Sequence, residues 1–160
     1  MTSARTPVAA TVLARAGVAH RLHEHPPART ESELHLTGLD VDTSAKTLAF
    51  TLPDGRIVLA AIPGRARLRY GNLARALGVP RTSLRPAGTE TLAVLGMEPG
   101  GVTPACDDPR VTLVLDRSLL GHPVLYCGSG LPEVSVELAA ADLAGLRPDV
   151  VLADLCSEAP

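Results

Sequence analysis

The chain has few aromatic residues: its 160 residues include one phenylalanine, two tyrosines and no tryptophan. Stacking platforms for single-stranded nucleic acid, aromatic cages and membrane-interface belts all need rings that this sequence does not supply. Hydrophobic residues still make up 46% of the chain and charged residues only 20%. We therefore expect an aliphatic core of useful size rather than a disordered chain.

Cysteine is also scarce, and long apolar runs are absent. Cys106, Cys127 and Cys156 are odd in number and form no Cys-x-x-Cys pair, which argues against a disulfide framework and a zinc knuckle. No window is long and apolar enough for a signal peptide or a membrane-spanning helix. These features predict a cytoplasmic protein that does not associate with membranes.

The chain shows no repeat and no linker, since its 14 prolines and 14 glycines are scattered along it. We expect one domain over residues 1–160. Helix start and stop signals predict short helices, and alternating or continuous apolar runs predict strands. The helices are expected at 7–16, 30–37, 73–77, 89–95 and 140–146, and the strands at 46–52, 56–63, 111–115, 124–127, 133–138 and 150–152.

Individual signals support these assignments. Thr6 is the expected N-cap of the first helix, a capping box opens the helix at Thr30, and Pro53-Asp54-Gly55 is a hairpin turn. The run 57–62 is apolar on both faces and predicts a central strand. Because strands and helices interleave without regular alternation, the fold class is α+β (mixed α/β), a mixed sheet with helices around it.

Lys46 is the only lysine, beside 14 arginines. Strand alternation puts it on the more apolar face of its strand, with Leu48 and Phe50. A partly desolvated ammonium is costly unless it meets an anion, so a ligand phosphate or carboxylate is a natural partner. The alternative is a strand-end lysine whose ammonium reaches solvent.

Seven arginines and no acidic residue lie between Arg56 and Arg85, densest at Arg65, Arg67 and Arg69. The whole chain carries a formal net charge of -2, so the rest of it is acidic. A basic stripe of this kind suits a polyanion such as nucleic acid. A solvated arginine-rich surface is the simpler alternative.

Two glycine-rich loops, 99–104 and 128–130, lack the features of a P-loop or a dinucleotide-binding turn but let backbone approach a ligand closely. Ser129 is not on a nucleophile elbow, because no helix follows it. His20, His23 and His25 have His-x-x-His-x-His spacing. Only two of the three would share a strand face, so a zinc site is not favoured.

Together these residues resemble the YbaK/ProX-type aminoacyl-tRNA deacylases. The resemblance is carried, in order, by Ala45-Lys46-Thr47-Leu48, Gly100-Gly101-Val102-Thr103-Pro104, Gly128-Ser129-Gly130 and the segment 137–143, and covers nearly the whole chain. It implies a partly barrel-like mixed sheet with short helices around it. It also implies hydrolysis of the ester of a mischarged tRNA in trans, without metal or cofactor.

The resemblance also implies site residues. Lys46 would meet the 3′-terminal phosphate or the ester, Gly101 and Pro104 would shape the pocket floor, and Gly128, Ser129 and Gly130 would face the ester carbonyl. Thr47, Asp142, Arg65, Arg67 and Arg69 are the expected substrate-binding residues. The partners implied are the tRNA 3′ end and an aminoacyl-tRNA synthetase; the oligomeric state is left open.

Thr47 after the lysine favours the cysteinyl-tRNA(Pro) deacylase branch, whereas the alanine-specific branch has asparagine there. Gly-Ser-Gly, followed by Leu131-Pro132-Glu133, departs from the Ser-Gly-Gly and basic residues of that branch. Two alternatives remain: a non-catalytic homologue that binds tRNA or another partner through the same pocket, and a small-molecule hydrolase using Ser129. No histidine has a sequence context that marks it as a paired base.

Overall fold

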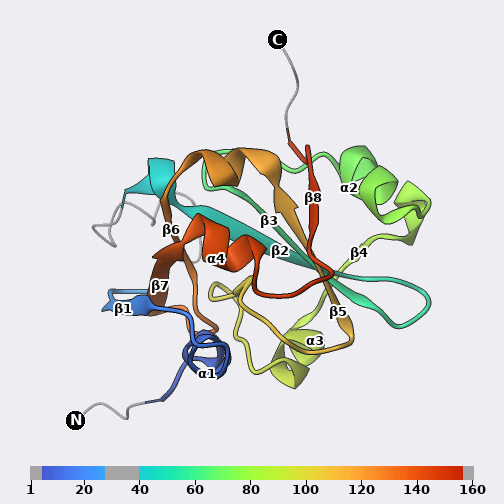
Figure 1. The fold of residues 1–160 in the computed structure, drawn as a ribbon. Helices are drawn as coiled ribbons and strands as arrows, with labels where there is room; N and C mark the ends of the chain where they lie inside the picture. The colour runs from blue at the N-terminus through green and yellow to red at the C-terminus, as the bar shows by residue number, and fades with distance from the viewer. Residues whose placement is uncertain (1–4, 28–39, 157–160) are drawn as a thin grey trace.

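A computed structural model describes residues 5–27 and 40–156, and places a five-stranded mixed sheet at the centre of the molecule (Figure 1). The spatial order is β4-β2-β3-β5-β8, with β2 antiparallel to β3 and β4, and β5 parallel to β3 and β8. Its strands are β2 (Ala45–Thr51), β3 (Ile57–Pro63), β4 (Arg85–Pro86), β5 (Val111–Asp116) and β8 (Val151–Ala153).

A second, three-stranded antiparallel sheet has the order β1-β7-β6. Its strands are β1 (His20–Glu24), β6 (Val124–Gly128) and β7 (Val134–Ala139). Buried and half-buried residues alternate strictly along β7, so this sheet has one apolar face and one polar face.

Short helices and 3-10 turns connect and cover the strands. The helices are α1 (Val8–Arg15), α2 (Tyr70–Leu77), α3 (Thr89–Val94) and α4 (Ala140–Ala144), and the turns are η2 (Val41–Thr43), η3 (Arg81–Ser83) and η4 (Arg117–Gly121). In Figure 1, α1 and α3 lie at one side of the molecule and α2 at the other. None of the helices in the described part of the chain is long and apolar enough to cross a bilayer.

The two faces of the five-stranded sheet bury separate apolar clusters. One face, with Leu59 and Leu113, packs on the apolar side of the small sheet and on α1, α3 and α4. The other face, with Phe50 and Val58, packs on α2 and on Leu155 near the end of the described chain. The aliphatic core expected from composition is therefore present on both sides of the sheet.

Most predicted elements are confirmed. The run 57–62 forms β3, the middle strand of its sheet, and is buried throughout. The first helix is confirmed, but its N-cap is Pro7 rather than Thr6. The helix predicted from Thr30 lies outside the described residues.

The two sheets of this partly barrel-like arrangement are not closed into a barrel. They join edge to edge at a parallel bridge between Ser44 and Tyr126, the only isolated bridge in the described chain. Beyond this bridge β2 pairs with β3 and β4, and β6 pairs with β7. The α+β class itself is confirmed.

Candidate functional site

A cavity of about 490 Å³ opens where the edges of β2 and β6 separate. Its lining includes Lys46 and Thr47 of β2, Gly128 of β6 and the loop residues Val102 and Pro132. A cavity of this size is in the range that holds a nucleotide-sized ligand. The site therefore lies between the open edges of two sheets.

Main-chain groups of both strands are directed into this gap. The Ala49 carbonyl accepts a hydrogen bond from the Ala87 amide at the edge of β2 that faces away from β3. Because every second residue of a strand directs its main-chain groups to the same edge, the Thr47 amide and carbonyl also point to this edge. On β6 the Pro123 carbonyl faces β7, where it accepts from Ala140. The same alternation directs the Gly128 amide away from β7 and toward the gap.

Two of the predicted glycines allow two segments at the cavity to pack closely against each other. A Cβ atom on Gly128 would lie 2.1 Å from the Val102 carbonyl oxygen, and one on Gly101 would lie 2.4 Å from the carbonyl carbon of Leu131. Real side chains do not tolerate such distances to backbone. Glycine at both positions is what lets the 99–104 loop pack against the segment 128–132.

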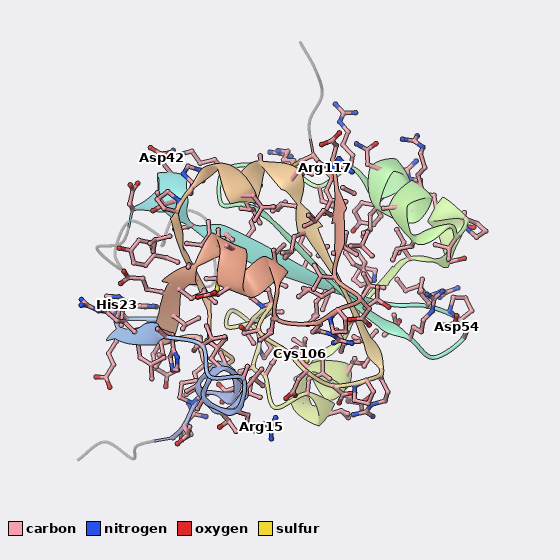
Figure 2. The ribbon with its side chains drawn as sticks, in the orientation of Figure 1. Arg15, His23, Asp42, Asp54, Cys106 and Arg117 are labelled. Carbon is pink, nitrogen blue, oxygen red and sulfur yellow. The ribbon has the colours of Figure 1, made fainter. Side chains whose placement is uncertain are left out.

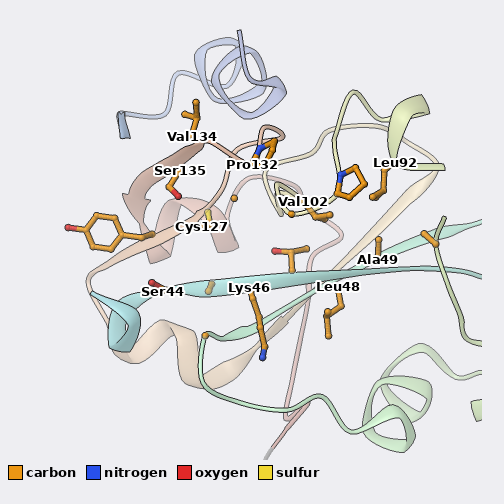
Figure 3. A pocket seen from close by; sticks show the side chains of 18 of the residues that line it. Ser44, Lys46, Leu48, Ala49, Leu92, Val102, Cys127, Pro132, Val134 and Ser135 are labelled. Atoms are coloured by element: carbon orange, nitrogen blue, oxygen red, sulfur yellow. The ribbon is translucent and has the colours of Figure 1, made fainter. Parts of the chain in front are cut away.

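Lys46 and Thr47 project to opposite sides of β2, as strand alternation requires. Figure 3 shows the Lys46 ammonium on one side of the strand, and Val102, Cys127 and Ser135 on the other. The cavity extends around the open edge of β2 and includes both sides. A ligand bound there can contact Lys46 and Thr47 at once only if it crosses this edge.

The Thr47 hydroxyl is buried without a hydrogen-bond partner. The residue is 9% exposed, it lines the cavity, and its Oγ1 atom makes no hydrogen bond in the structure. An unpaired hydroxyl of this kind costs about 1–3 kcal/mol in the folded protein. A ligand atom in the cavity would remove that cost.

Ser129 and Gly130 lie beside the cavity, not in its lining. Ser129 is 0% exposed, and its hydroxyl donates to the Val134 carbonyl at 2.7 Å. The Gly130 amide donates to the Gly101 carbonyl at 2.6 Å. Of the three residues predicted in this loop, Gly128 is therefore the one that faces the cavity.

Pro104 is buried at the end of the 99–104 loop, and Asp142 is exposed in the first turn of α4. Neither residue is part of the cavity lining. The structure thus brings Lys46, Thr47 and Gly128 together and leaves these two outside the group.

The three predicted arginines lie in the β3–α2 connection, which borders the cavity at its two ends through Gly64 and Tyr70. All three arginines are exposed, and Arg65 forms an ion pair with Asp42 at 2.9 Å. Asp42 thus offsets the charge of Arg65, and Lys46 lies among the lining residues on the Leu48 side of β2.

A serine–histidine pair that sequence reasoning did not find also lines the cavity. His25 follows β1, and its Nε2 atom lies 2.7 Å from Ser135 Oγ of β7. Next to it, His23, labelled in Figure 2, contacts Glu137 through Nε2 at 2.7 Å. The His23 ring also meets the Tyr126 ring edge-on. The signal in the sequence was weak: two histidines on one face of a strand and a serine in a strictly alternating strand, 110 residues apart.

Cysteine chemistry at the cavity is disfavoured. Cys127 lines the cavity, and burial raises the pKa of its thiol to about 12. A thiol with this pKa stays protonated near neutral pH and is a poor nucleophile. Within residues 5–27 and 40–156, no three His, Cys, Asp or Glu side chains converge as metal ligands.

Comparisons with a family model and with solved structures point to the same family. Residues 25–146 match the model of the aminoacyl-tRNA editing domain. The structure of a candidate trans-editing enzyme for prolyl-tRNA synthetase is 29% identical, with 97% of this chain and 100% of that chain covered and a TM-score of 0.79. The hypothetical protein APE2540 is 28% identical over 94% of this chain and 99% of that one, with a TM-score of 0.78.

A more distant structure shares the fold alone. A candidate signal transduction protein of Marinobacter aquaeolei VT8 is 13% identical, with a TM-score of 0.67. The alignment covers 96% of this chain and 31% of that protein. The fold thus also occurs as one part of a larger chain.

Proposed function

Because the chain belongs to the aminoacyl-tRNA editing domain family, we propose that it hydrolyses the ester of a mischarged tRNA in trans, without a metal ion. The observation that carries this proposal is the placement of Lys46 and Thr47, which both line the cavity. Adjacent on one strand, they face the two sides of an edge that an aminoacylated nucleotide would cross.

Lys46 is proposed to bind phosphate of the terminal nucleotide. Its ammonium lies on the Leu48 side of β2 (Figure 3), where Ala66 and Leu68 of the β3–α2 connection also pack. Arg65, Arg67 and Arg69 would continue this positive surface along the tRNA backbone, because each phosphate contact adds affinity without reading sequence. Lys46 is thus assigned to the nucleotide rather than to the ester carbonyl.

The aminoacyl end is proposed to lie on the other side of β2. There the unpaired Thr47 hydroxyl can bond to the amino acid, and the Gly128 amide can stabilise the charge that develops on the ester carbonyl. Preorganised donors of this kind are worth about 3–4 kcal/mol of transition-state stabilisation each. Fixing the ester between them supplies the positioning that such a reaction needs.

The walls on this side favour an uncharged amino acid. Leu92, Val102, Cys127 and Pro132 line it, so a charged side chain would meet apolar surface. Together with Thr47, this supports cysteinyl-tRNA(Pro) as the first substrate to test. Apolar walls alone discriminate one methylene by only about 1–3 kcal/mol, so neighbouring small amino acids belong in the same panel.

The test is release of amino acid from cysteinyl-, alanyl-, seryl- and threonyl-tRNA, with a chelator present. We expect hydrolysis of at least one of these substrates by the wild-type protein. The Lys46→Ala variant should raise KM at least 10-fold, because one phosphate contact is lost, with a smaller effect on kcat. Saturable tRNA binding without hydrolysis of any member would instead identify a non-catalytic homologue.

A further inference from the structure

The chain's only phenylalanine and both of its tyrosines line the same cavity. Phe50, Tyr70 and Tyr126 come from three different elements, β2, α2 and β6. Three rings are too few for a platform that stacks successive bases, but one ring is enough for one base. Their common position therefore suits a ligand that contains a flat ring system.

Tyr70 lies on the Lys46 side of β2. It is the first residue of α2 and packs against the apolar cluster that includes Phe50 and Leu73. Leu73, nearly one turn further along the helix, is fully buried, so α2 holds the tyrosine in a fixed place. Strand alternation puts Lys46, Leu48 and Phe50 on this same face, and Figure 3 shows Lys46 and Leu48 projecting together.

The Tyr70 ring keeps at least one face clear of Phe50. The two rings pack edge to face, with centroids 5.3 Å apart and an interplanar angle of 83°. In such a pair at most one face of either ring is covered by the other. Phe50 is 2% exposed, whereas Tyr70 is half-buried and contributes to the cavity lining. Phe50 thus supports the tyrosine, and Tyr70 is the ring that a ligand can reach.

Leu48 and Pro86 complete an apolar end of the cavity around this ring. Leu48 is half-buried and follows Lys46 on the same face of β2. Pro86 pairs with Phe50 across the β2–β4 ladder, so its side chain is on this face too. Both residues line the cavity. This side of the cavity therefore has an ammonium at one end, and a ring with two aliphatic neighbours at the other.

The spacing of the two ends suits a nucleotide. Lys46 and Phe50 are four residues apart, which is about 13 Å along a strand, and both line the cavity. A phosphate bound to the Lys46 ammonium leaves the ribose beside Leu48 and the base beside Tyr70. Every base has a flat face that gains from stacking on an aromatic ring.

From this arrangement we propose that the terminal base of the tRNA stacks on Tyr70, with Leu48 and Pro86 as the apolar contacts around it. The inference rests on the proposed function, and it names the part of the substrate that this side of the cavity takes. Lys46 holds the phosphate, Tyr70 holds the base, and the ester is left to cross the open edge of β2. Because the stacking is the same in the ground state and the transition state, Tyr70 acts on binding rather than on the chemical step.

Proton NMR tests the stacking on the wild-type protein, without charged tRNA. With two tyrosines, one phenylalanine and no tryptophan, the aromatic spectrum is simple, and the Tyr126→Phe variant assigns the tyrosine signals. Adenosine 5′-monophosphate should shift the Tyr70 ring signals upfield, because the ring current of a stacked base acts on them. Ribose 5-phosphate, which has the phosphate without the base, should leave these signals in place.

The affinities for the same two probes separate the base from the phosphate. Tyr70→Leu should weaken binding of adenosine 5′-monophosphate by at least about 5-fold, because a stacking contact is lost, and should leave binding of ribose 5-phosphate unchanged. Tyr70→Phe keeps the ring and should bind like the wild type. Lys46→Ala should weaken binding of both probes. Circular dichroism checks that each variant is folded.

Deacylation of charged tRNA is the second readout. We expect Tyr70→Leu to raise KM by at least about 5-fold, with little change in kcat, because the lost contact contributes equally to the ground state and the transition state. Tyr70→Phe should restore the wild-type KM. A role of Tyr70 in packing α2 alone would not produce this dependence on the ring.

The outcomes separate the two proposals. If adenosine 5′-monophosphate shifts the Tyr70 signals but no charged tRNA is hydrolysed, the proposed function fails and the base site stands. If the wild type hydrolyses charged tRNA while Tyr70→Leu keeps the wild-type KM, the base lies elsewhere and the proposed function stands. Stacking on Tyr70 is overturned if its signals stay in place up to the solubility limit of adenosine 5′-monophosphate, or if ribose 5-phosphate shifts them equally.

Discussion

A methyl group at Gly128 would lie 2.1 Å from the Val102 carbonyl oxygen, whereas one at Gly121 would meet nothing within 4 Å. These two glycines therefore form a matched pair for substitution by alanine. In Gly128→Ala the 99–104 loop must move away from β6, which also displaces the wall of the cavity.

We expect Gly128→Ala to lower the free energy of unfolding by about 1–3 kcal/mol, the usual cost of overpacking, and to abolish deacylation. Gly121→Ala should change neither property measurably. Chemical denaturation and the deacylation assay check both variants. Full activity of Gly128→Ala would show that this wall of the cavity does not hold the ester.

Thr47 offers a second test at the residue scale, because its buried hydroxyl has no partner in the protein. Thr47→Val replaces that hydroxyl with a methyl group of similar volume, so we expect the stability to stay equal or rise by up to about 1 kcal/mol. Deacylation should fall at least 10-fold, since the proposed bond to the substrate is lost. Thr47→Ser, which keeps the hydroxyl, is the control; a destabilised Thr47→Val would mean that the hydroxyl is already bonded.

At the scale of elements, one carboxylate joins three parts of the fold. Asp116 ends β5 and is 5% exposed; it accepts hydrogen bonds from the Ser118 amide and hydroxyl at the start of η4 and from the Leu155 amide at 2.7 Å. Burial raises the pKa of Asp116, but these hydrogen bonds outweigh it and hold the pKa below its ordinary value. The segment after β8 is thereby fastened over the Phe50 side of the sheet.

The depressed pKa sets the sign of a pH effect. A carboxyl whose pKa is lower in the folded protein contributes stability above its ordinary pKa, and that contribution is lost as the pH falls from about 4 toward the folded value. We expect the wild type to lose more unfolding free energy than Asp116→Asn between pH 5 and pH 3. Urea denaturation across this range measures the difference, and equal losses would contradict the assigned hydrogen bonds.

Local signals and long-range pairing explain which elements the sequence could predict. The hairpin of β2 and β3 follows from a turn tripeptide between two apolar runs, and Lys46 and Thr47 come with it as neighbours on one strand. β1 has the polar sequence His-Arg-Leu-His-Glu and is ordered by its pairing with β7. The His25–Ser135 contact depends on the register of these two strands, which no local pattern sets.

At the scale of the whole molecule, the charge distribution predicts how binding responds to salt. Outside residues 56–85 the chain has a net negative charge, which repels tRNA. Affinity for tRNA must therefore come from the arginine-rich part between Arg56 and Arg85. Within it, the segment 65–69 carries three exposed arginines and lies between Gly64 and Tyr70, which both line the cavity. The tRNA is expected to follow this segment away from its aminoacylated end.

We therefore expect the triple variant with glutamine at Arg65, Arg67 and Arg69 to bind tRNA more weakly and with a shallower dependence of log Kd on log salt. The slope should fall by roughly 0.7–0.9 for each phosphate contact removed. Arg110→Gln, which removes an arginine paired with Asp108 outside this segment, is the control. Equal slopes for wild type and triple variant would place the tRNA on another surface.

The parallel bridge between Ser44 and Tyr126 also has a thermodynamic consequence. Within the described chain it is the one isolated bridge that links the two sheets, and both of its residues line the cavity. A ligand seated between β2 and β6 would extend the junction and act as a clamp on both sheets. Any ligand that binds only the folded protein stabilises it by about 2.7 kcal/mol at 100 times its Kd. For a non-hydrolysable aminoacyl-adenosine analogue seated across this junction, hydrogen exchange should in addition slow along both strand edges together.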